Sequence, residues 1–434
     1  MEYKYHQESY SDYIGRLFGS TKNVLPVTLQ VTNRCNLSCT YCYQTNKHQQ
    51  VMNLNDAKKM IDLILDDDSL IHKHISPGEK HEALCLEFIG GEPFLEIELI
   101  EQICDYFIVE AIKKHHRFAS NFVISLCSNG VLYNTPQVQH FLHKYEDNIS
   151  LTITIDGCKE LHDQCRIFPD GSPSYDIAIA AAKDWEHKHP NLNAKVTIAP
   201  DNLSYLYDGI LNMVQLNYKC IFANTVFEAG WTNDLAKQFY YELKNIADYF
   251  NDNDLVEEVE LSLFQDDFFQ PKSIDDNDNW CGGNADMLAM DPNGNLFTCI
   301  RYMETSLNNE QPEYIIGNIN DGLCSTPEEE QRLKCLHCLT RRSQSTDECF
   351  YCPIAAGCAW CSGYNYQVNG TPNKRVTYIC CMHKARALAN VYFWNKYYLK
   401  HNIDKTFEMY CPKEWALEII DENEYNMLVE LTKR

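Results

Sequence analysis

Short apolar runs alternate with longer amphipathic stretches through the first half of this 434-residue chain, and this alternation limits the fold more than any other feature. The runs are rich in β-branched residues and bounded by Gly, Asn or Asp, which is typical of buried strands. They predict strands at Val27–Val31, Ala83–Ile89, Phe122–Cys127, Leu151–Ile155, Ala194–Ile198 and Cys220–Phe227. The stretches between them predict helices at Leu54–Leu65, Ile97–Lys113, Pro136–Lys144 and Tyr175–Lys188. Repeated strand–helix units indicate a parallel α/β sheet and fit a partial (β/α)6 TIM-like barrel, in which the loops after the strands build the active site.

Three cysteines with C-x3-C-x2-C spacing, Cys35, Cys39 and Cys42, follow the first predicted strand. Cys thiolates are the usual ligands of a [4Fe–4S] cluster, which has four iron corners. Three protein ligands leave one iron open to bind and activate a small molecule. A zinc site is the alternative interpretation, although zinc sites usually show two separated pairs of cysteines.

Composition and charge limit the cellular compartment and the classes of partner that we expect. The sequence shows no secretory signal and no apolar run of membrane-spanning length, so we expect a cytoplasmic protein without a membrane partner. In that compartment 21 cysteines are metal ligands or buried thiols more often than disulfides. The formal charge of −24 argues against nucleic acid as the main partner. It is compatible with a basic peptide partner, although solubility is the simpler explanation.

The sequence predicts five segments along the chain. They are an N-terminal arm (1–25), the barrel (26–231), a helical connector (232–280), a cysteine-rich domain (281–383) and C-terminal helices (384–434). An amphipathic pattern at Trp231–Phe250 predicts one long helix near the start of the connector. The turn Asp291-Pro292-Asn293-Gly294 predicts a hairpin between strands at Met287–Met290 and Leu296–Cys299.

The cysteine triplet, with Tyr41 directly before its third member, resembles the signature of radical S-adenosylmethionine (SAM) enzymes. The resemblance implies that Cys35, Cys39 and Cys42 hold a [4Fe–4S] cluster whose open iron chelates SAM. An electron from the cluster would cleave SAM to a 5′-deoxyadenosyl radical, so the cofactor carries the chemistry and the protein positions it. Tyr41 would make a backbone contact near the adenine.

Two short motifs after the next strands resemble further motifs of the same family. Gly90-Gly91-Glu92-Pro93 follows the second strand, and Ser128-Asn129-Gly130 follows the third. Glycine lets a backbone approach a ligand closely, and the resemblance assigns Gly90 and Gly91 to the SAM amino group. The Glu92 carboxylate could accept hydrogen bonds from that ammonium group. Ordinary turns are the alternative for both motifs.

The segment from Thr154 to Arg166 resembles the S-x-D-G-x-x-x-x-H-D-x-x-R segment of radical SAM enzymes that modify peptides. The resemblance implies that Thr154, Asp156 and Arg166 help to bind SAM. Arginine suits the SAM carboxylate because its planar fork pairs bidentately. We expect His162 and Asp163 to cap or brace the loop and not to act as acid–base catalysts.

The downstream pattern Cys349-x2-Cys352-x5-Cys358-x2-Cys361, preceded by a hairpin with flanking cysteines, resembles a SPASM domain with two auxiliary [4Fe–4S] clusters. The resemblance assigns the first auxiliary cluster to Cys281, Cys299 and Cys361. It assigns the second to Cys349, Cys352, Cys358 and either Cys380 or Cys381. The fourth ligand of the first cluster stays open: Cys335 or Cys338 could supply it, or one iron could receive a substrate thiolate. Two zinc sites are the alternative.

Radical SAM enzymes with a SPASM domain mostly modify ribosomally made peptides or proteins. The run from Cys349 to Tyr366 looks most like maturases of peptides with Cys-x-x-x repeats, the ranthipeptide type. We therefore expect thioether crosslinks in a short Cys-rich precursor peptide, and a low-potential electron donor of the flavodoxin or ferredoxin type.

Several other functions compete with thioether formation. Other SPASM-type reactions are carbon–carbon crosslinking, epimerisation and formylglycine formation in sulfatases. Ile300 argues against formylglycine formation, because sulfatase-maturating members carry at that position an Asp that acts as the base. A non-enzymatic iron–sulfur or zinc-binding electron carrier or scaffold is the alternative from another class.

Overall fold

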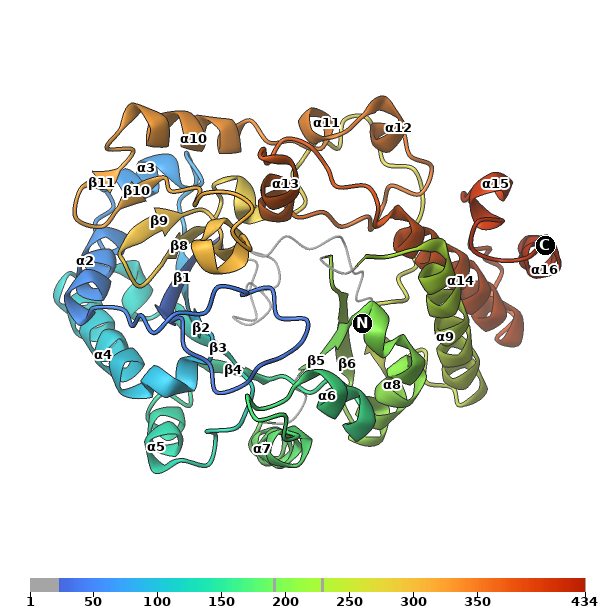
Figure 1. Cartoon of the computed structure of the whole chain (residues 1–434), viewed down its shortest axis with the longest axis horizontal. Coiled ribbons are helices and arrows are strands. Elements are labelled where there is room, and N and C mark those ends of the chain that lie inside the picture. Colours follow the sequence, from blue (N-terminus) through green and yellow to red (C-terminus); the bar gives the residue numbers. More distant parts are fainter. Residues whose placement is uncertain (1–22, 190–192, 228–229, 434) are drawn as a thin grey trace.

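The computed structural model describes residues 23–189, 193–227 and 230–433, which leaves most of the predicted N-terminal arm outside the described residues. Strands and helices alternate along its first half (Figure 1). The strands are β1 (Val24–Thr32), β2 (Ala83–Gly90), β3 (Phe122–Ser128), β4 (Ile149–Ile153), β5 (Asn193–Ile198) and β6 (Cys220–Thr225). The covering helices are α2 (Leu54–Ile64), α4 (Ile97–Lys113), α5 (Pro136–Lys144), α7 (Tyr175–Lys188), α8 (Leu206–Gln215) and α9 (Asn233–Asp252). The predicted mixed α/β class is confirmed.

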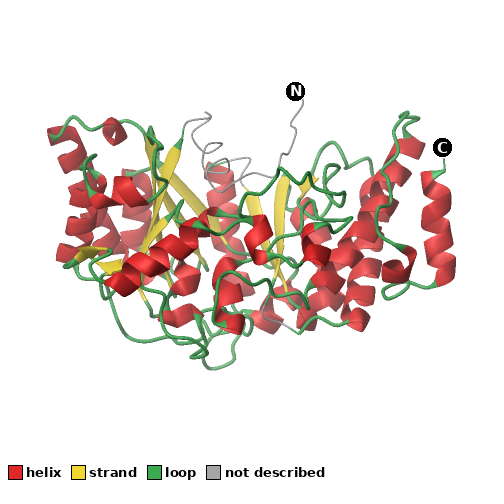
Figure 2. Ribbon diagram, turned by 90° about the horizontal axis from the view of Figure 1, so that it is seen from above, coloured by secondary structure: helices red, strands yellow, loops and turns green. Residues whose placement is uncertain are grey.

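The parallel strands form two sheets that together make the partial barrel. β1, β2, β3 and β4 pair in that order, and β5 pairs with β6. The described ladders do not join β4 to β5, so the barrel is split at that point. Viewed from above, the strands lie between the helices that cover them (Figure 2).

The predicted hairpin of the cysteine-rich region lies in the barrel sheet. Its strands, β8 (Leu288–Met290) and β9 (Asn295–Phe297), are antiparallel to each other, and β8 runs parallel to β1 with Val27 opposite Leu288. This pairing satisfies backbone groups of β1 that would otherwise form an open edge. Two short strands, β10 (Gly317–Asn318) and β11 (Gly322–Leu323), extend the sheet further. The domain boundary at residue 281 stays a prediction, and the sheet runs across it.

Strand β7 (Glu260–Leu261), which pairs in parallel with β6, was not predicted from the sequence. Two residues are too few to show an alternating or continuous apolar pattern. The remaining helices are α3 (Leu70–His74), α6 (Lys159–Cys165), α10 (Pro327–His337), α11 (Arg341–Gln344), α12 (Asp347–Phe350), α13 (Ser362–Asn369), α14 (Cys380–Lys400), α15 (Lys413–Ala416) and α16 (Glu422–Thr432).

Residues of β1 point in turn to the helix-packed core and to the barrel interior. Leu25, Val27 and Leu29 belong to the large buried core that also includes residues of α2 and α4. Thr28 lies at an alternate position, and its hydroxyl donates to the Glu87 carboxylate of β2 at 2.6 Å. Because neighbouring residues of a strand point to opposite faces, the interior of the barrel is polar at this level.

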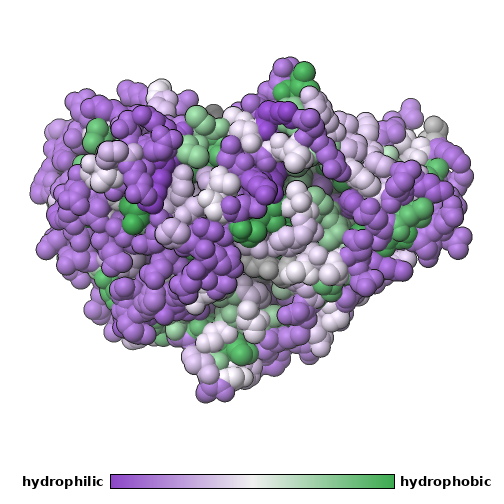
Figure 3. All heavy atoms as spheres, turned by 45° about the horizontal axis from the view of Figure 1, so that its top comes forward, coloured by the Kyte–Doolittle hydropathy of each residue, from purple (hydrophilic) through white to green (hydrophobic). Residues whose placement is uncertain are grey.

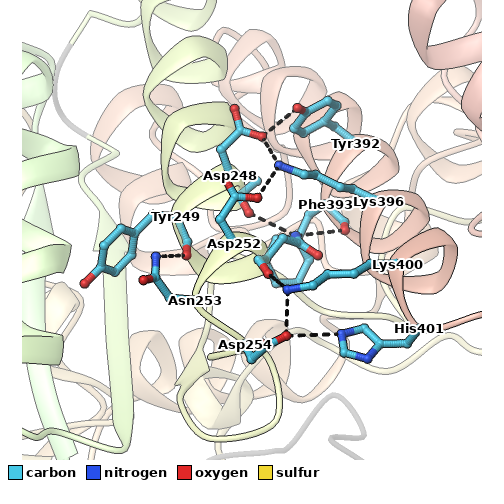
Figure 4. A network of polar contacts seen from close by, with 12 residues as sticks. Asp248, Tyr249, Asp252, Asn253, Asp254, Tyr392, Phe393, Lys396, Lys400 and His401 are labelled. Atoms are coloured by element: carbon cyan, nitrogen blue, oxygen red, sulfur yellow. Dashed lines mark hydrogen bonds and ion pairs between the residues drawn. The ribbon is translucent and has the colours of Figure 1, made fainter.

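Helices α9 and α14 pack side by side and are joined by a polar network (Figure 4). Lys396 donates to Asp248 at 2.6 Å and to Asp252 at 3.1 Å, and the Tyr392 hydroxyl also donates to Asp248. Lys400 donates to Asp254 at 2.6 Å. These contacts hold α14, whose first residue is Cys380, in a fixed position against the barrel connector.

Apolar packing also attaches α14 to the core. Phe393 of α14 is 3% exposed, and its ring stacks on Phe264 with a centroid distance of 4.0 Å.

In the described part of the chain, no helix is both long and apolar enough to cross a membrane. Hydrophilic residues cover most of the face shown in Figure 3, between scattered hydrophobic groups.

The Phe393→Ala variant should lower the free energy of unfolding by about 3–5 kcal/mol, because it leaves a cavity where α14 meets the core. The matched control is Leu399→Ala on the same helix, since Leu399 is 47% exposed and its truncation should cost under about 0.5 kcal/mol. Chemical denaturation measures both. Equal losses in the two variants would show that this contact does not anchor α14.

Candidate active site

The first cysteine group lies in the loop after β1, and three thiols come within electrostatic range of one another. Burial raises the pKa of Cys39 to about 11, the Arg166 guanidinium opposes that shift, and Cys42 and Cys35 add to it. The loop is fixed by backbone bonds from Ser38 to Ile167 and from Thr40 to Cys165, at 2.8 and 3.0 Å. The cysteine loop is therefore paired with the segment that carries Arg166.

The Gly90–Gly91 turn packs directly on the cysteine loop. A side chain at Gly91 would place its Cβ 2.3 Å from the Arg34 carbonyl oxygen and 2.8 Å from the Cys35 Cβ. Backbone bonds from Gly91 to Thr32 and from Glu92 to Arg34 hold the two loops together at 3.1 and 2.9 Å. Only glycine fits this close approach.

Glu92 links the second and third loops through its buried carboxylate. It accepts from the Ser128 hydroxyl at 2.7 Å and from the Asn129 and Phe94 amides at 2.9 and 3.1 Å. Burial raises its pKa, and the hydrogen bonds from Asn129 and Ser128 oppose that shift. The side-chain Nδ2 of Asn129 donates to Asn36 Oδ1 at 2.7 Å, which ties the third loop to the cysteine loop. Both oxygens of Glu92 already have protein donors, so its clearest role here is to hold the loops in place.

Arg166 is held at the mouth of the barrel by Tyr41 and Asp156. Its Nη1 donates to the Tyr41 hydroxyl at 2.7 Å and lies 3.7 Å from Asp156, while Tyr41 donates to the same carboxylate. The Thr197 amide of β5 also donates to Asp156, at 3.0 Å. The buried Arg166 Nε has no hydrogen-bond partner among the described residues. A donor left over beside the cysteine loop fits an anionic group such as a carboxylate.

Thr154 directly follows β4 and lies beside other predicted SAM residues. Its amide donates to the Ser128 carbonyl at 3.0 Å, and its hydroxyl lies 3.5 Å from the Cys127 thiol. The structure thus brings together, around the first cysteine group, every residue that the sequence assigned to SAM. These are Tyr41, Gly90, Gly91, Glu92, Ser128, Asn129, Thr154, Asp156 and Arg166.

His162 and Asp163 brace the loop, as expected. The Asp156 amide donates to His162 Nδ1 at 3.3 Å, and His162 Nε2 lies 3.0 Å from the Ser174 hydroxyl. Burial lowers the pKa of His162 to about 3, so the imidazole is neutral near pH 7. Asp163 accepts from the Ser174 and Tyr175 amides at the start of α7, at 3.1 and 2.8 Å.

A second cysteine group contains Cys281, Cys299 and Cys361. Burial raises the pKa of Cys281 to about 12, with Cys361 adding to the shift, and Cys299 interacts with both. A Cβ at Gly283 would lie 3.5 Å from the Cys281 sulfur, so this glycine leaves room beside the thiols. The Tyr364 amide donates to the Cys361 sulfur at 3.4 Å.

Tyr43 and Arg301 lie between the first and second cysteine groups, and sequence reasoning missed both. Tyr43 is partly buried, and its raised pKa follows mainly from desolvation, with contributions from both Cys42 and Cys299. The Arg301 guanidinium lies 5.0 Å from the Tyr43 ring centroid and 5.6 Å from that of Tyr364. The only available signal was adjacency, because Tyr43 follows Cys42 and Arg301 comes two residues after Cys299.

A third group contains Cys349, Cys352, Cys358 and Cys380. Burial raises the pKa of Cys380 to about 11, and Cys349 and Cys352 are the next largest causes. Cys358 interacts with the other three. By contrast, the Cys381 thiol donates to the Tyr378 carbonyl at 3.4 Å. The geometry therefore favours Cys380 over Cys381 as the fourth member.

The two remaining predicted ligands lie in and just after α10. Cys335 lies beside Tyr314, and both burial and this thiol raise the pKa of Tyr314. Cys338 is exposed. In the described part of the chain, no three His, Cys, Asp or Glu side chains are close enough to hold a single metal ion. A zinc ion draws its thiolates to about 2.3 Å from one centre, whereas a [4Fe–4S] cluster takes each thiolate at a different iron.

Known proteins resemble the chain in sequence and in fold. A family described as a 4Fe-4S single cluster domain matches residues 26–166. The radical SAM cyclopropyl synthase TigE of Paramaledivibacter caminithermalis is 23% identical over 374 residues, which cover 81% of this chain and 71% of TigE.

Two solved structures share the fold. One is anSMEcpe with bound AdoMet and Kp18Cys peptide, with a TM-score of 0.59 and 16% identity over 88% of this chain and 98% of that one. The other is Streptococcus suis SuiB bound to its precursor peptide SuiA, with a TM-score of 0.53 and 12% identity over 85% and 79%. The iron–sulfur family match and the alignment with TigE thus show a resemblance in sequence to radical SAM enzymes, and the anSMEcpe and SuiB structures show that the chain shares their fold.

Proposed function

We propose that this enzyme modifies a ribosomally synthesised peptide by forming Cys thioether crosslinks. The observation that carries the proposal is that Tyr43, next to Cys42, lies 5.0 Å from the guanidinium of Arg301, which comes two residues after Cys299. A peptide held there would meet the radical-generating site and the first auxiliary group together. The structures of anSMEcpe and SuiB with bound peptides support a peptide substrate.

We further propose that three [4Fe–4S] clusters and SAM are the cofactors. Cys35, Cys39 and Cys42 would hold the SAM-binding cluster, and the second and third cysteine groups would hold the two auxiliary clusters. When bound, SAM supplies a 5′-deoxyadenosyl radical that takes a hydrogen atom from the peptide. A flavodoxin- or ferredoxin-type protein would supply the low-potential electron.

The chain's own residues would bind and orient the cofactor. Arg166 presents its unpartnered Nε to the SAM carboxylate, while Tyr41 and Asp156 fix the rest of its guanidinium. Gly91 brings the backbone close to the cysteine loop, and Glu92 keeps that backbone in position. These groups restrict the orientation of SAM before any chemistry takes place.

Arg301 and Tyr43 would position the peptide cysteine. The guanidinium opposes the raised pKa of the neighbouring Cys299 thiol, of which burial is the largest cause. A cation at this place would likewise favour the thiolate of a substrate cysteine, which is the form that makes the new bond. Thioether formation then releases one proton and one electron besides the hydrogen atom that SAM removes.

A second candidate reaction is carbon–carbon bond formation. The alignment of 81% of this chain with TigE, a radical SAM cyclopropyl synthase, favours this alternative. Ile300 in place of the expected Asp continues to disfavour formylglycine formation. The alignment with TigE, a radical SAM synthase, argues against the non-enzymatic carrier considered from the sequence.

The cofactor assignment predicts about 12 irons per chain after anaerobic reconstitution, falling to about 8 in Cys35/Cys39/Cys42→Ala. The matched control is Cys158→Ala, since Cys158 lies at the start of α6 outside the three groups and its loss should leave the iron content unchanged. Elemental analysis measures iron and zinc together. About 4 irons with bound zinc would mean that the downstream cysteines form zinc sites.

Arg166→Gln should weaken SAM binding about 10- to 100-fold, because it removes a charged hydrogen-bond donor. Arg34→Gln is the matched control, since Arg34 is next to Cys35 but pairs with Glu96. Equilibrium binding to the reconstituted protein and 5′-deoxyadenosine formation are the measurements. Unchanged SAM affinity in Arg166→Gln would remove this residue from the site.

Co-expression with a short Cys-rich peptide encoded beside the gene should give a product lacking two hydrogen atoms per crosslink. Mass spectrometry after thiol alkylation separates the two reactions. A thioether consumes a cysteine thiol and blocks alkylation, whereas a carbon–carbon link leaves the thiol free. SAM cleavage with an unmodified peptide would contradict both forms of the proposal for that peptide.

A further inference from the structure

Arg375 is fixed against the third cysteine group, in the segment between α13 and α14. Its Nη1 donates to the Cys349 sulfur at 3.4 Å, and its guanidinium carbon lies 3.4 Å from the Trp360 ring centroid. Its backbone amide donates to Gln344 at 3.1 Å. The stacked Trp360 ring and the anchored backbone restrict the position of the Arg375 guanidinium.

The rest of this guanidinium lacks protein acceptors. Arg375 Nε and Nη2 are buried atoms with no hydrogen-bond partner in the described part of the chain. Burying such donors is costly unless an acceptor or an opposite charge is present. Electrostatic interactions of Arg375 with Cys352 and Cys358 show that the guanidinium lies near more than one thiol of the group.

Two further arginines add positive charge around the same thiols. Arg386 of α14 donates to the Ser262 carbonyl at 3.0 Å and interacts electrostatically with Cys358. Burial lowers its pKa to about 10, so it remains protonated near pH 7. Arg341 is 2% exposed and interacts with Cys349.

This concentration of cations stands out in a chain with a net charge of −24. At the second group, one arginine, Arg301, acts on the Cys299 thiol. A cluster gains one unit of negative charge on reduction, so nearby cations and hydrogen bonds to its sulfurs favour the reduced form.

We propose that Arg375, assisted by Arg386, stabilises the reduced form of the cluster at Cys349, Cys352, Cys358 and Cys380, making it the most easily reduced of the three. The inference rests on the cofactor assignment under the proposed function. In the reduction step the cluster takes one electron and no bond changes. That electron is the one released when the peptide thioether forms, and the accompanying proton leaves to solvent.

The test is a potentiometric titration of the fully reconstituted enzyme, without peptide, followed by electron paramagnetic resonance. At the wild-type midpoint potential of this cluster, Arg375→Gln should lower the ratio of reduced to oxidised form about tenfold. Arg375→Lys keeps the charge and should show a smaller change. Arg342→Gln, on the neighbouring α11 and paired with Asp347, is the matched control and should change none of the three potentials.

Unchanged potentials with full iron content in Arg375→Gln would overturn the inference. Loss of four irons in both Arg375 variants would also overturn it, because the arginine would then act in assembly and not on the potential. Failure of the underlying cofactor assignment looks different: the wild-type protein itself would hold fewer than three clusters.

Discussion

Strand β1 has hydrogen-bonded neighbours on both edges, and the rest of the site depends on this arrangement. One edge pairs with β2 and the other with β8, while the end of the strand leads into the first cysteine loop. The same strand therefore fixes the first cysteine group and the start of the region that carries the second cysteine group. The Gly91 contact with Arg34 and Cys35 then locks the loop after β2 to the loop after β1.

Buried polar groups hold the loops at the strand ends. Glu92 gathers donors from two loops, and Asp156 gathers Tyr41, Arg166 and the Thr197 amide from three parts of the chain. Such groups are stable in the interior only while their partners stay in place. Loss of one partner would disturb several loops at once, so the site behaves as one connected unit.

Much of the fold and of the first site could be predicted from the sequence because its signals are local. Helices such as Ile97–Lys113 carry their periodicity within one segment, and Cys35, Cys39 and Cys42 lie within eight residues. The break between β4 and β5, the two-residue β7 and the position of Tyr43 between Cys42 and Cys299 depend on tertiary packing. The choice between Cys380 and Cys381 could not be predicted either, because it depends on how the start of α14 is oriented.

The pairing of β8 with β1 has a consequence for how the protein is made. Val27 lies opposite Leu288, a separation of 288 − 27 = 261 residues. At ribosomal speeds of roughly 5–20 residues per second, the edge of β1 stays without this neighbour for on the order of 10 to 50 s during synthesis. The first cysteine loop is then already complete, whereas the second group still awaits Cys361. Long-range pairing of this kind slows folding, and a strand edge that waits for its partner is open to aggregation.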